Sequence, residues 1–215
     1  MTFADRSEAG RRLGVRLKAK GFEKPIVYAL PRGGLPVGFE VAKMLKCPLD
    51  IVLVRKIRAP FQPELALGAV VDGRPPEIVL NDFATQLQPS KEAIDAAARL
   101  ELQELARRRA IYLAGRPTEP AKGRTAIVVD DGLATGATAR AALRAMRRQE
   151  PKRLILAIPV AAVGSLRDLS READEIICLE QPEDFDAVGA YYLDFTQLSD
   201  AEAVEILSKA RANLV

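Results

Sequence analysis

Two adjacent acids, Asp130 and Asp131, follow an apolar run and precede a loop of small residues. Two neighbouring carboxylates can accept hydrogen bonds from a pair of sugar hydroxyls. The loop leads into a segment of helical character, and the backbone amides at a helix N-terminus bind phosphate. A glycine at 136 lets the backbone approach a ligand closely, and two threonine hydroxyls add donors. The segment predicts a ribose 5-phosphate site, with contacts from Asp130, Asp131, Ala134, Thr135, Gly136, Ala137 and Thr138.

Three alternative assignments fit these residues less well. A capped helix that happens to follow two surface acids accounts for neither the acid pair nor the two threonines. A Walker-type phosphate loop is disfavoured because Gly132 and Gly136 have the wrong spacing and no lysine follows them. The dinucleotide fingerprint is absent too, since the glycines at 33, 34 and 38 are not spaced as it requires.

A second loop, Arg32-Gly33-Gly34 after Pro31, lies between an apolar run and a helical segment. The amides of a glycine pair beside an arginine can form a nest for an anion. Taken alone, this loop is equally well explained as a simple turn.

Apolar runs that could be strands alternate with helical segments along the chain. Continuous apolar strands suit a sheet covered on both faces, and the alternation is typical of a doubly wound, mostly parallel α/β sheet. In such sheets ligands bind beyond the carboxyl ends of the strands. The predicted strands are 26–30, 50–54, 125–129, 154–160 and 175–179, and the predicted helices are 35–45, 138–149, 166–171 and 201–212.

Three segments fall outside this alternation. Residues 57–74 contain prolines and glycines, which predicts a mobile connection and then a short extended piece at 67–71. Residues 89–112 have apolar positions at helical spacing and predict a long inserted helix, whose arginines 107–109 are interpreted as a solvated face or a dimer contact. Residues 181–195 are rich in aromatics and predict a small hood. We expect one domain over 1–215, with its core at about 22–180 and the hood and terminal helix at about 181–215.

Composition excludes several kinds of chemistry. The 215 residues include no histidine, so Ser-His-Asp triads and histidine-containing zinc sites are ruled out. Cys47 and Cys178 are too few for a disulfide framework or a four-thiolate metal site. A charged N-terminus and the absence of a long apolar run predict a cytoplasmic protein that does not enter a membrane. The net charge of +3 is spread along the chain, which favours small phosphates over nucleic acid.

The segment 126–138 resembles the signature of the type I phosphoribosyltransferases, which bind 5-phosphoribosyl 1-pyrophosphate (PRPP). It departs from that signature at Gly132, where a larger apolar residue is more usual. The resemblance implies the type I phosphoribosyltransferase fold and transfer of the 5-phosphoribosyl group to a nitrogenous base or amine, with release of pyrophosphate. It also implies Mg²⁺ held mainly by PRPP, with no direct protein ligand, and a homodimer.

The resemblance further implies roles for particular residues. Arg32, Gly33 and Gly34 would hold the pyrophosphate. Arg55 and Lys56, in a mobile loop after the second strand, would join Asp131 as the catalytic residues, with a charged strand end as the alternative interpretation of this pair. Phe185 of the hood would stack on a base, with ordinary core packing the alternative.

The acceptor is left open by the sequence. Family members that act on 6-oxopurines commonly carry an acid at the position of Ala134, so hypoxanthine and guanine are disfavoured. Two competing functions use the same pocket: a regulatory protein that senses PRPP or a nucleotide without catalysis, and a hydrolase that passes the ribosyl group to water.

Overall fold

Parallel strands β1 (Pro25–Ala29), β2 (Leu49–Ile51), β6 (Thr125–Val129), β7 (Arg153–Val160) and β8 (Glu175–Glu180) form the main sheet. The computed structural model describes residues 2–59, 62–73, 76–80, 84, 90–115 and 117–212. The strand order in this 5-stranded sheet is β2-β1-β6-β7-β8. The predicted five-stranded parallel sheet is therefore confirmed. The strand predicted over 50–54 is displaced, because β2 ends at Ile51 and Val54 begins a strand of another sheet.

The strand order reverses between β1 and β6. The chain adds β2 on one side of β1 and then returns to place β6 on the other. Loops at the carboxyl ends of two such strands diverge to opposite faces and leave a crevice between them, which is where doubly wound sheets bind ligands. The loops at this point are the two that the sequence marks, beginning at Pro31 and Asp130.

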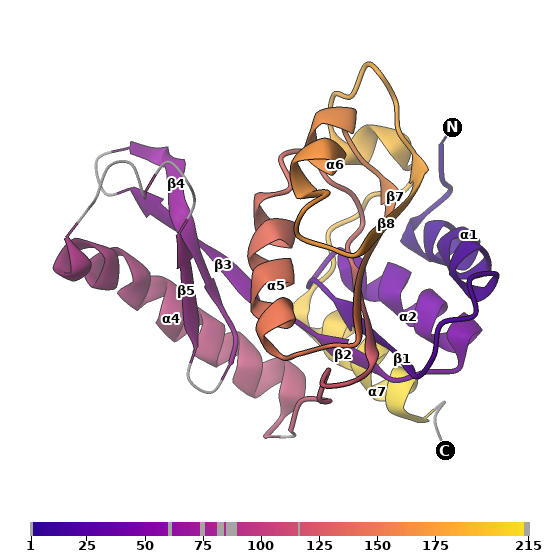
Figure 1. Ribbon diagram of the computed structural model, residues 1–215, viewed down its shortest axis with the longest axis horizontal. Coiled ribbons are helices and arrows are strands. Elements are labelled where there is room, and N and C mark those ends of the chain that lie inside the picture. The colour runs from indigo at the N-terminus through magenta and orange to yellow at the C-terminus, as the bar shows by residue number, and fades with distance from the viewer. Residues whose placement is uncertain are drawn as a thin grey trace.

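Helices cover both faces of the main sheet (Figure 1). In β6, Ile127 and Val129 pack in the cluster that includes Leu13 and Val41, whereas Ala126 and Val128 pack in the cluster that includes Leu143. This two-sided burial explains why β6 has apolar residues on both faces rather than an alternation of apolar and polar residues. The helices around the sheet are α1 (Arg6–Lys18), α2 (Gly34–Leu45), α5 (Ala137–Arg148), α6 (Val163–Leu169) and α7 (Asp200–Ala212). For residues 6–18 the sequence reasoning made no prediction.

A second, antiparallel sheet stands beside the first (Figure 1). It consists of β3 (Val54–Ala59), β4 (Gln62–Val71) and β5 (Glu77–Leu80), in the order β3-β4-β5. The short extended piece predicted at 67–71 is present as the second half of β4, but the connection predicted before it is wrong, because residues 54–59 and 62–66 already lie in strands. Pro63 suggested a break, but β4 accommodates it where the pairing with β3 shifts register, and prolines are tolerated at such bulges.

The long helix predicted at 89–112 is present as α4 (Lys91–Leu113). Ser90 caps its N-terminus by accepting a hydrogen bond from the amide of Ala93. Its buried residues Ala98, Leu105 and Tyr112 pack with Ile57 and Val70, so the helix covers the second sheet. The prediction of a long helix packed on a sheet is therefore confirmed, although the sheet is the one that was not predicted. In the described part of the chain, each helix is too short or too polar to cross a membrane.

Candidate functional site

Asp130 and Asp131 lie at the carboxyl end of β6, in the crevice between the two loops. The Nε of Arg6 donates to Oδ2 of Asp131 over 2.8 Å, and both side chains are largely buried. The hydroxyl of Tyr192 donates to the Asp131 carbonyl over 2.6 Å, and the amide of Asp131 donates to Oδ1 of Asp130 over 2.9 Å. The orientation of the acid pair is therefore set by contacts from α1 and from the C-terminal region.

The environment of the pair disfavours two negative charges. Burial, followed by repulsion from Asp131, raises the pKa of Asp130 well above its usual range. Burial also raises the pKa of Asp131, against the opposing effect of Arg6. Carboxylates removed from water in this way are stabilised by hydroxyl donors or a cation, which a bound sugar or its metal would bring.

The loop after the acids leads into α5 and offers its N-terminus to a ligand. Gly136 caps the helix with a positive φ of 69°, a conformation that glycine adopts without strain. The cap has no side-chain hydrogen bond, and the first turn of α5 contains no acidic residue. Thr135 and Ala137 are exposed and Thr138 is half-buried, while Ser165 donates to the Ala134 carbonyl and holds the loop. The site predicted at 134–138 is thus an accessible helix N-terminus suited to phosphate.

The glycine loop packs directly against the acid pair. A Cβ atom added at Gly33 would lie 2.1 Å from Oδ2 of Asp131, and one at Gly34 would lie 2.7 Å from the carbonyl oxygen of Val129. Only glycine permits this approach at both positions. The structure thereby brings Arg32, Gly33 and Gly34 beside the acids, about a hundred residues further along the chain.

Lys56 and Arg55 lie in different surroundings. Lys56 is exposed and lines a cavity of about 190 Å³ together with Thr135, Ala137 and Arg140. Arg55 instead donates from Nε to Glu101 of α4 over 2.8 Å. The structure therefore places Lys56 beside the loop 134–138, which precedes and enters α5, whereas Arg55 is held against the inserted helix α4.

The hood packs against the strand ends through its aromatic residues. Phe185 stacks on Tyr191 with ring centroids 5.5 Å apart and packs in the cluster of Phe3, Val160 and Tyr192. Phe195 is the hood ring that lines the crevice, where the Arg6 guanidinium carbon lies 3.8 Å from its centroid. A base-stacking role for Phe185 stays a prediction.

Gly132 departs from the family signature for a packing reason. A Cβ atom at this position would lie 2.5 Å from Cγ1 of Val188, in the short 3₁₀ helix η1 (Val188–Tyr191). Val188 therefore fills the space that a larger side chain at 132 would take.

The crevice contains residues that sequence reasoning missed. A cavity of about 510 Å³ opens beside Asp131 and Gly33, and Arg6, Arg108 and Phe195 contribute to its walls. No local pattern marks Arg6, since its acidic partner is 125 residues away. The run 107–109 was visible, but its interpretation as a solvated face is wrong for two members: Arg108 lines the cavity, and Arg109 forms an ion pair with Asp72 at 2.5 Å.

The acid pair supplies only part of a metal site. Across the described residues, no group of three or more acids and cysteines is arranged to hold a metal ion. Mg²⁺ usually keeps several waters and binds through one or two carboxylates together with substrate phosphates. Asp130 and Asp131 provide two half-buried carboxylates next to the glycine loop, and this donor set fits Mg²⁺ carried by a phosphorylated substrate.

Comparison with known proteins agrees with this geometry. Residues 8–196 match the family model described as "Phosphoribosyl transferase domain". Two Mycobacterium tuberculosis proteins, each named "Putative phosphoribosyl transferase", are 45% identical over 209 residues, or 97% of this chain. The chain spans about half, 47%, of the length of these curated relatives.

A solved structure is also similar over nearly the whole chain. The crystal structure of TT1426 from Thermus thermophilus is 42% identical, has a TM-score of 0.87, and is matched over 97% of this chain and 99% of that one. Because the family model covers most of the chain and includes the acid pair, both glycine-containing loops and most of the hood, the chain belongs to the phosphoribosyl transferase domain family.

Proposed function

We propose that this protein is a phosphoribosyltransferase that moves the 5-phosphoribosyl group from PRPP to a nitrogenous base or amine and releases pyrophosphate. The observation that carries the proposal is the contact between Gly33 and Asp131. This contact joins a loop suited to a diphosphate to an acid pair suited to ribose hydroxyls, beside the open N-terminus of α5. The three parts of PRPP therefore have matching chemical partners on the two loops that follow β1 and β6.

The reaction breaks the bond between the anomeric carbon and the pyrophosphate oxygen and forms a bond from that carbon to the acceptor nitrogen. Positive charge develops on the sugar and negative charge on the leaving group. The α5 amides hold the 5-phosphate, and Asp130 and Asp131 hold the ribose hydroxyls, so the sugar stays fixed while the bond breaks. Arg32 and the amides of Gly33 and Gly34 face the leaving pyrophosphate, where they stabilise the developing charge.

Mg²⁺ carried by PRPP would supply further positive charge to the leaving group, and Asp130 and Asp131 are the carboxylates that would help to hold it. Lys56 would add a cation from the second sheet, since it shares a cavity with Thr135 of the phosphate loop. Arg55 could contact the ligand only after breaking its ion pair with Glu101. Replacing Arg55 and replacing Lys56 should therefore affect ligand binding to different extents. Ala134 offers no carboxylate to an acceptor, and this favours bases and amines other than 6-oxopurines.

The proposal is tested by incubating the protein with PRPP, Mg²⁺ and a panel of purine, pyrimidine and amine acceptors while pyrophosphate release is followed. Release that depends on one acceptor supports a transferase. Release without an acceptor indicates a hydrolase, and tight PRPP binding without release indicates a sensor.

Two variants link the activity to the acid pair. Asp131→Asn should weaken PRPP binding while the protein stays folded, because the charge that accepts from the ribose hydroxyls is lost. Asp95→Asn, at an exposed position on α4, is the matched control and should bind PRPP like the wild type. Equal affinity of the two variants would contradict the ribose assignment. The expected homodimer is a separate proposal, which light scattering after gel filtration would test.

A further inference from the structure

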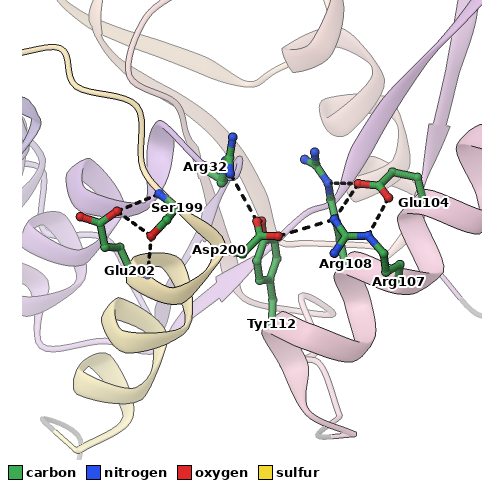
Figure 2. Close-up of polar contacts among 8 residues, drawn as sticks. All are labelled: Arg32, Glu104, Arg107, Arg108, Tyr112, Ser199, Asp200 and Glu202. Carbon is green, nitrogen blue, oxygen red and sulfur yellow. Dashed lines mark hydrogen bonds and ion pairs between the residues drawn. The ribbon is translucent and has the colours of Figure 1, made fainter.

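The inserted helix α4 delivers an arginine to the crevice. Arg108 lines the same cavity as Arg32, Gly33 and Asp131. The Nε of Arg108 donates to Oε1 of Glu104 over 2.8 Å, and this hydrogen bond orients the guanidinium group. In Figure 2 the terminal nitrogens of Arg108 point away from Glu104, to the same side as those of Arg32. Two guanidinium groups from different elements therefore face one space.

An internal carboxylate already occupies part of this positive region. Asp200, the first residue of α7, lies 3.5 Å from Arg32 and 3.5 Å from Arg107, and accepts a hydrogen bond from the Tyr112 hydroxyl (Figure 2). The Tyr112 hydrogen bond and then the arginine charges lower the pKa of Asp200. The contact with Arg32 is long for a charge-assisted hydrogen bond, so a better-placed anion can replace it.

We propose that Arg108 is a further binding residue for the diphosphate of PRPP and for released pyrophosphate, acting together with Arg32. This assignment rests on the proposed function. Arg108 comes from α4 rather than from the glycine loop, and its terminal nitrogens form the planar fork that binds phosphate oxygens in pairs. Asp200 is the carboxylate that engages Arg32 when the diphosphate is absent. The role accounts for the length of α4, because its C-terminal half must extend from the second sheet to the crevice.

Arg107 provides a matched control. It also pairs with Glu104, through contacts of 2.7 and 3.0 Å, but its side chain is 50% exposed and does not line the cavity. Arg107→Gln and Arg108→Gln remove the same charge from the same helix and loosen the same glutamate, and Arg107→Gln also removes the 3.5 Å contact with Asp200. A general effect of charge or of helix stability would appear in both variants, whereas loss of a ligand contact would appear only in Arg108→Gln.

The experiment is isothermal titration of each variant with pyrophosphate and with PRPP in the presence of Mg²⁺, and with ribose 5-phosphate. We expect Arg108→Gln to weaken pyrophosphate and PRPP binding by about 10-fold to 100-fold, the effect of losing hydrogen bonds to a charged group. Ribose 5-phosphate lacks the diphosphate, so its affinity should stay unchanged. Arg107→Gln should bind all three ligands like the wild type, and Arg108→Lys should be intermediate because it keeps the charge without the fork.

Several results would overturn the assignment. Equal pyrophosphate affinity of Arg108→Gln and Arg107→Gln, with wild-type PRPP binding intact, would remove Arg108 from the diphosphate site and leave the proposed function standing. Equal loss of ribose 5-phosphate and pyrophosphate binding would show a general disturbance of the crevice. A loss limited to acceptor KM would place Arg108 at the acceptor instead. A wild-type protein that binds neither PRPP nor pyrophosphate would overturn both this assignment and the proposed function.

Discussion

The guanidinium of Arg6 lies 2.8 Å from the carboxylate of Asp131 and 3.8 Å from the ring of Phe195, and it donates to the carbonyl of Thr196 over 2.9 Å. One side chain from α1 thus ties the acid pair to the segment that follows the hood. An arginine paired with an acid in this way orients the acid and partly offsets the cost of burying its charge. Arg6 is therefore a positioning residue for Asp131.

Replacing Arg6 with glutamine should impair both stability and ligand binding. The variant leaves a largely buried carboxylate without its partner, which costs about 3–5 kcal/mol when the pair is fully buried. The pKa of Asp131 should rise further, because Arg6 lowers it in the wild type. Thermal unfolding should show a lower Tm, and titration with PRPP should show weaker binding.

Arg11→Gln is the control for this prediction. Arg11 lies on the same helix, but its side chain is 53% exposed and 3.8 Å from Glu40, and exposed pairs of this kind contribute about 0–1 kcal/mol. Similar Tm values for the two variants would mean that the Arg6 pair has no special role.

Asp130 should make the ligand-free protein less stable at neutral pH than its asparagine variant. Burial raises its pKa above the unfolded value of 3.8, so its contribution to stability is fully present below pH 3.8 and is lost as pH rises toward the folded-state pKa. The asparagine of Asp130→Asn does not ionise, so the variant avoids this pH-dependent loss of stability. Its side-chain oxygen can still accept a hydrogen bond from the amide of Asp131. Its Tm at pH 7.5 should exceed that of the wild type, by roughly 2–4 °C for each kcal/mol gained.

The pH dependence of the difference is the decisive measurement. The gap in Tm between Asp130→Asn and the wild type should narrow as the pH falls and close only below pH 3.8, where Asp130 is protonated in both the folded and the unfolded protein. A gap that does not change with pH would show that the ionisation of Asp130 is not its cause. PRPP binding by Asp130→Asn should nonetheless be weaker, because a ribose-binding charge is lost.

Gly33 should not tolerate alanine. The added Cβ would lie 2.1 Å from Oδ2 and 2.6 Å from Cγ of Asp131, so either the acid or the loop must move. Overpacking of this kind costs about 1–3 kcal/mol, and the displaced carboxylate should bind ribose poorly. Titration with PRPP should show a loss of at least about 10-fold, the equivalent of 1.4 kcal/mol.

Gly164→Ala is the matched substitution. Gly164 lies in α6 with no atom within 4 Å of an added Cβ, and alanine is the better helix former. It should keep wild-type affinity and Tm or gain slightly in Tm. If Gly33→Ala behaved in the same way, the close packing of the glycine loop on the acid pair would not matter for binding.

The parts of this fold that sequence reasoning identified are those with a local signature. The central strands have apolar residues on both faces because helices cover both sides of the sheet, and the acid pair and the glycine loop directly follow β6 and β1. The second sheet was missed because Pro63 and Gly68 interrupt its pattern, although the shifted register tolerates the first. Arg6 has no local signature, and the visible run 107–109 does not reveal that Arg108 lines the cavity, because both side chains meet residues distant in sequence.

Gly132 and Val188 should show compensating effects. An alanine at 132 would place its Cβ 2.5 Å from Cγ1 and 2.9 Å from Cγ2 of Val188. The single variant Gly132→Ala should therefore lose about 1–3 kcal/mol of unfolding free energy through overpacking. Val188→Ala removes both γ-methyl groups and makes room, so the double variant should be more stable than the sum of the single effects predicts.

Urea unfolding of the wild type, the two single variants and the double variant measures this coupling. Residues in direct contact show interaction energies of about 0.5–3 kcal/mol, and here the sign should favour the double variant. Additive effects would mean that Val188 does not fill the space above Gly132. A compensating pair would instead show that the hood holds the loop of the acid pair in place, since Val188 belongs to η1 and Gly132 directly follows Asp131.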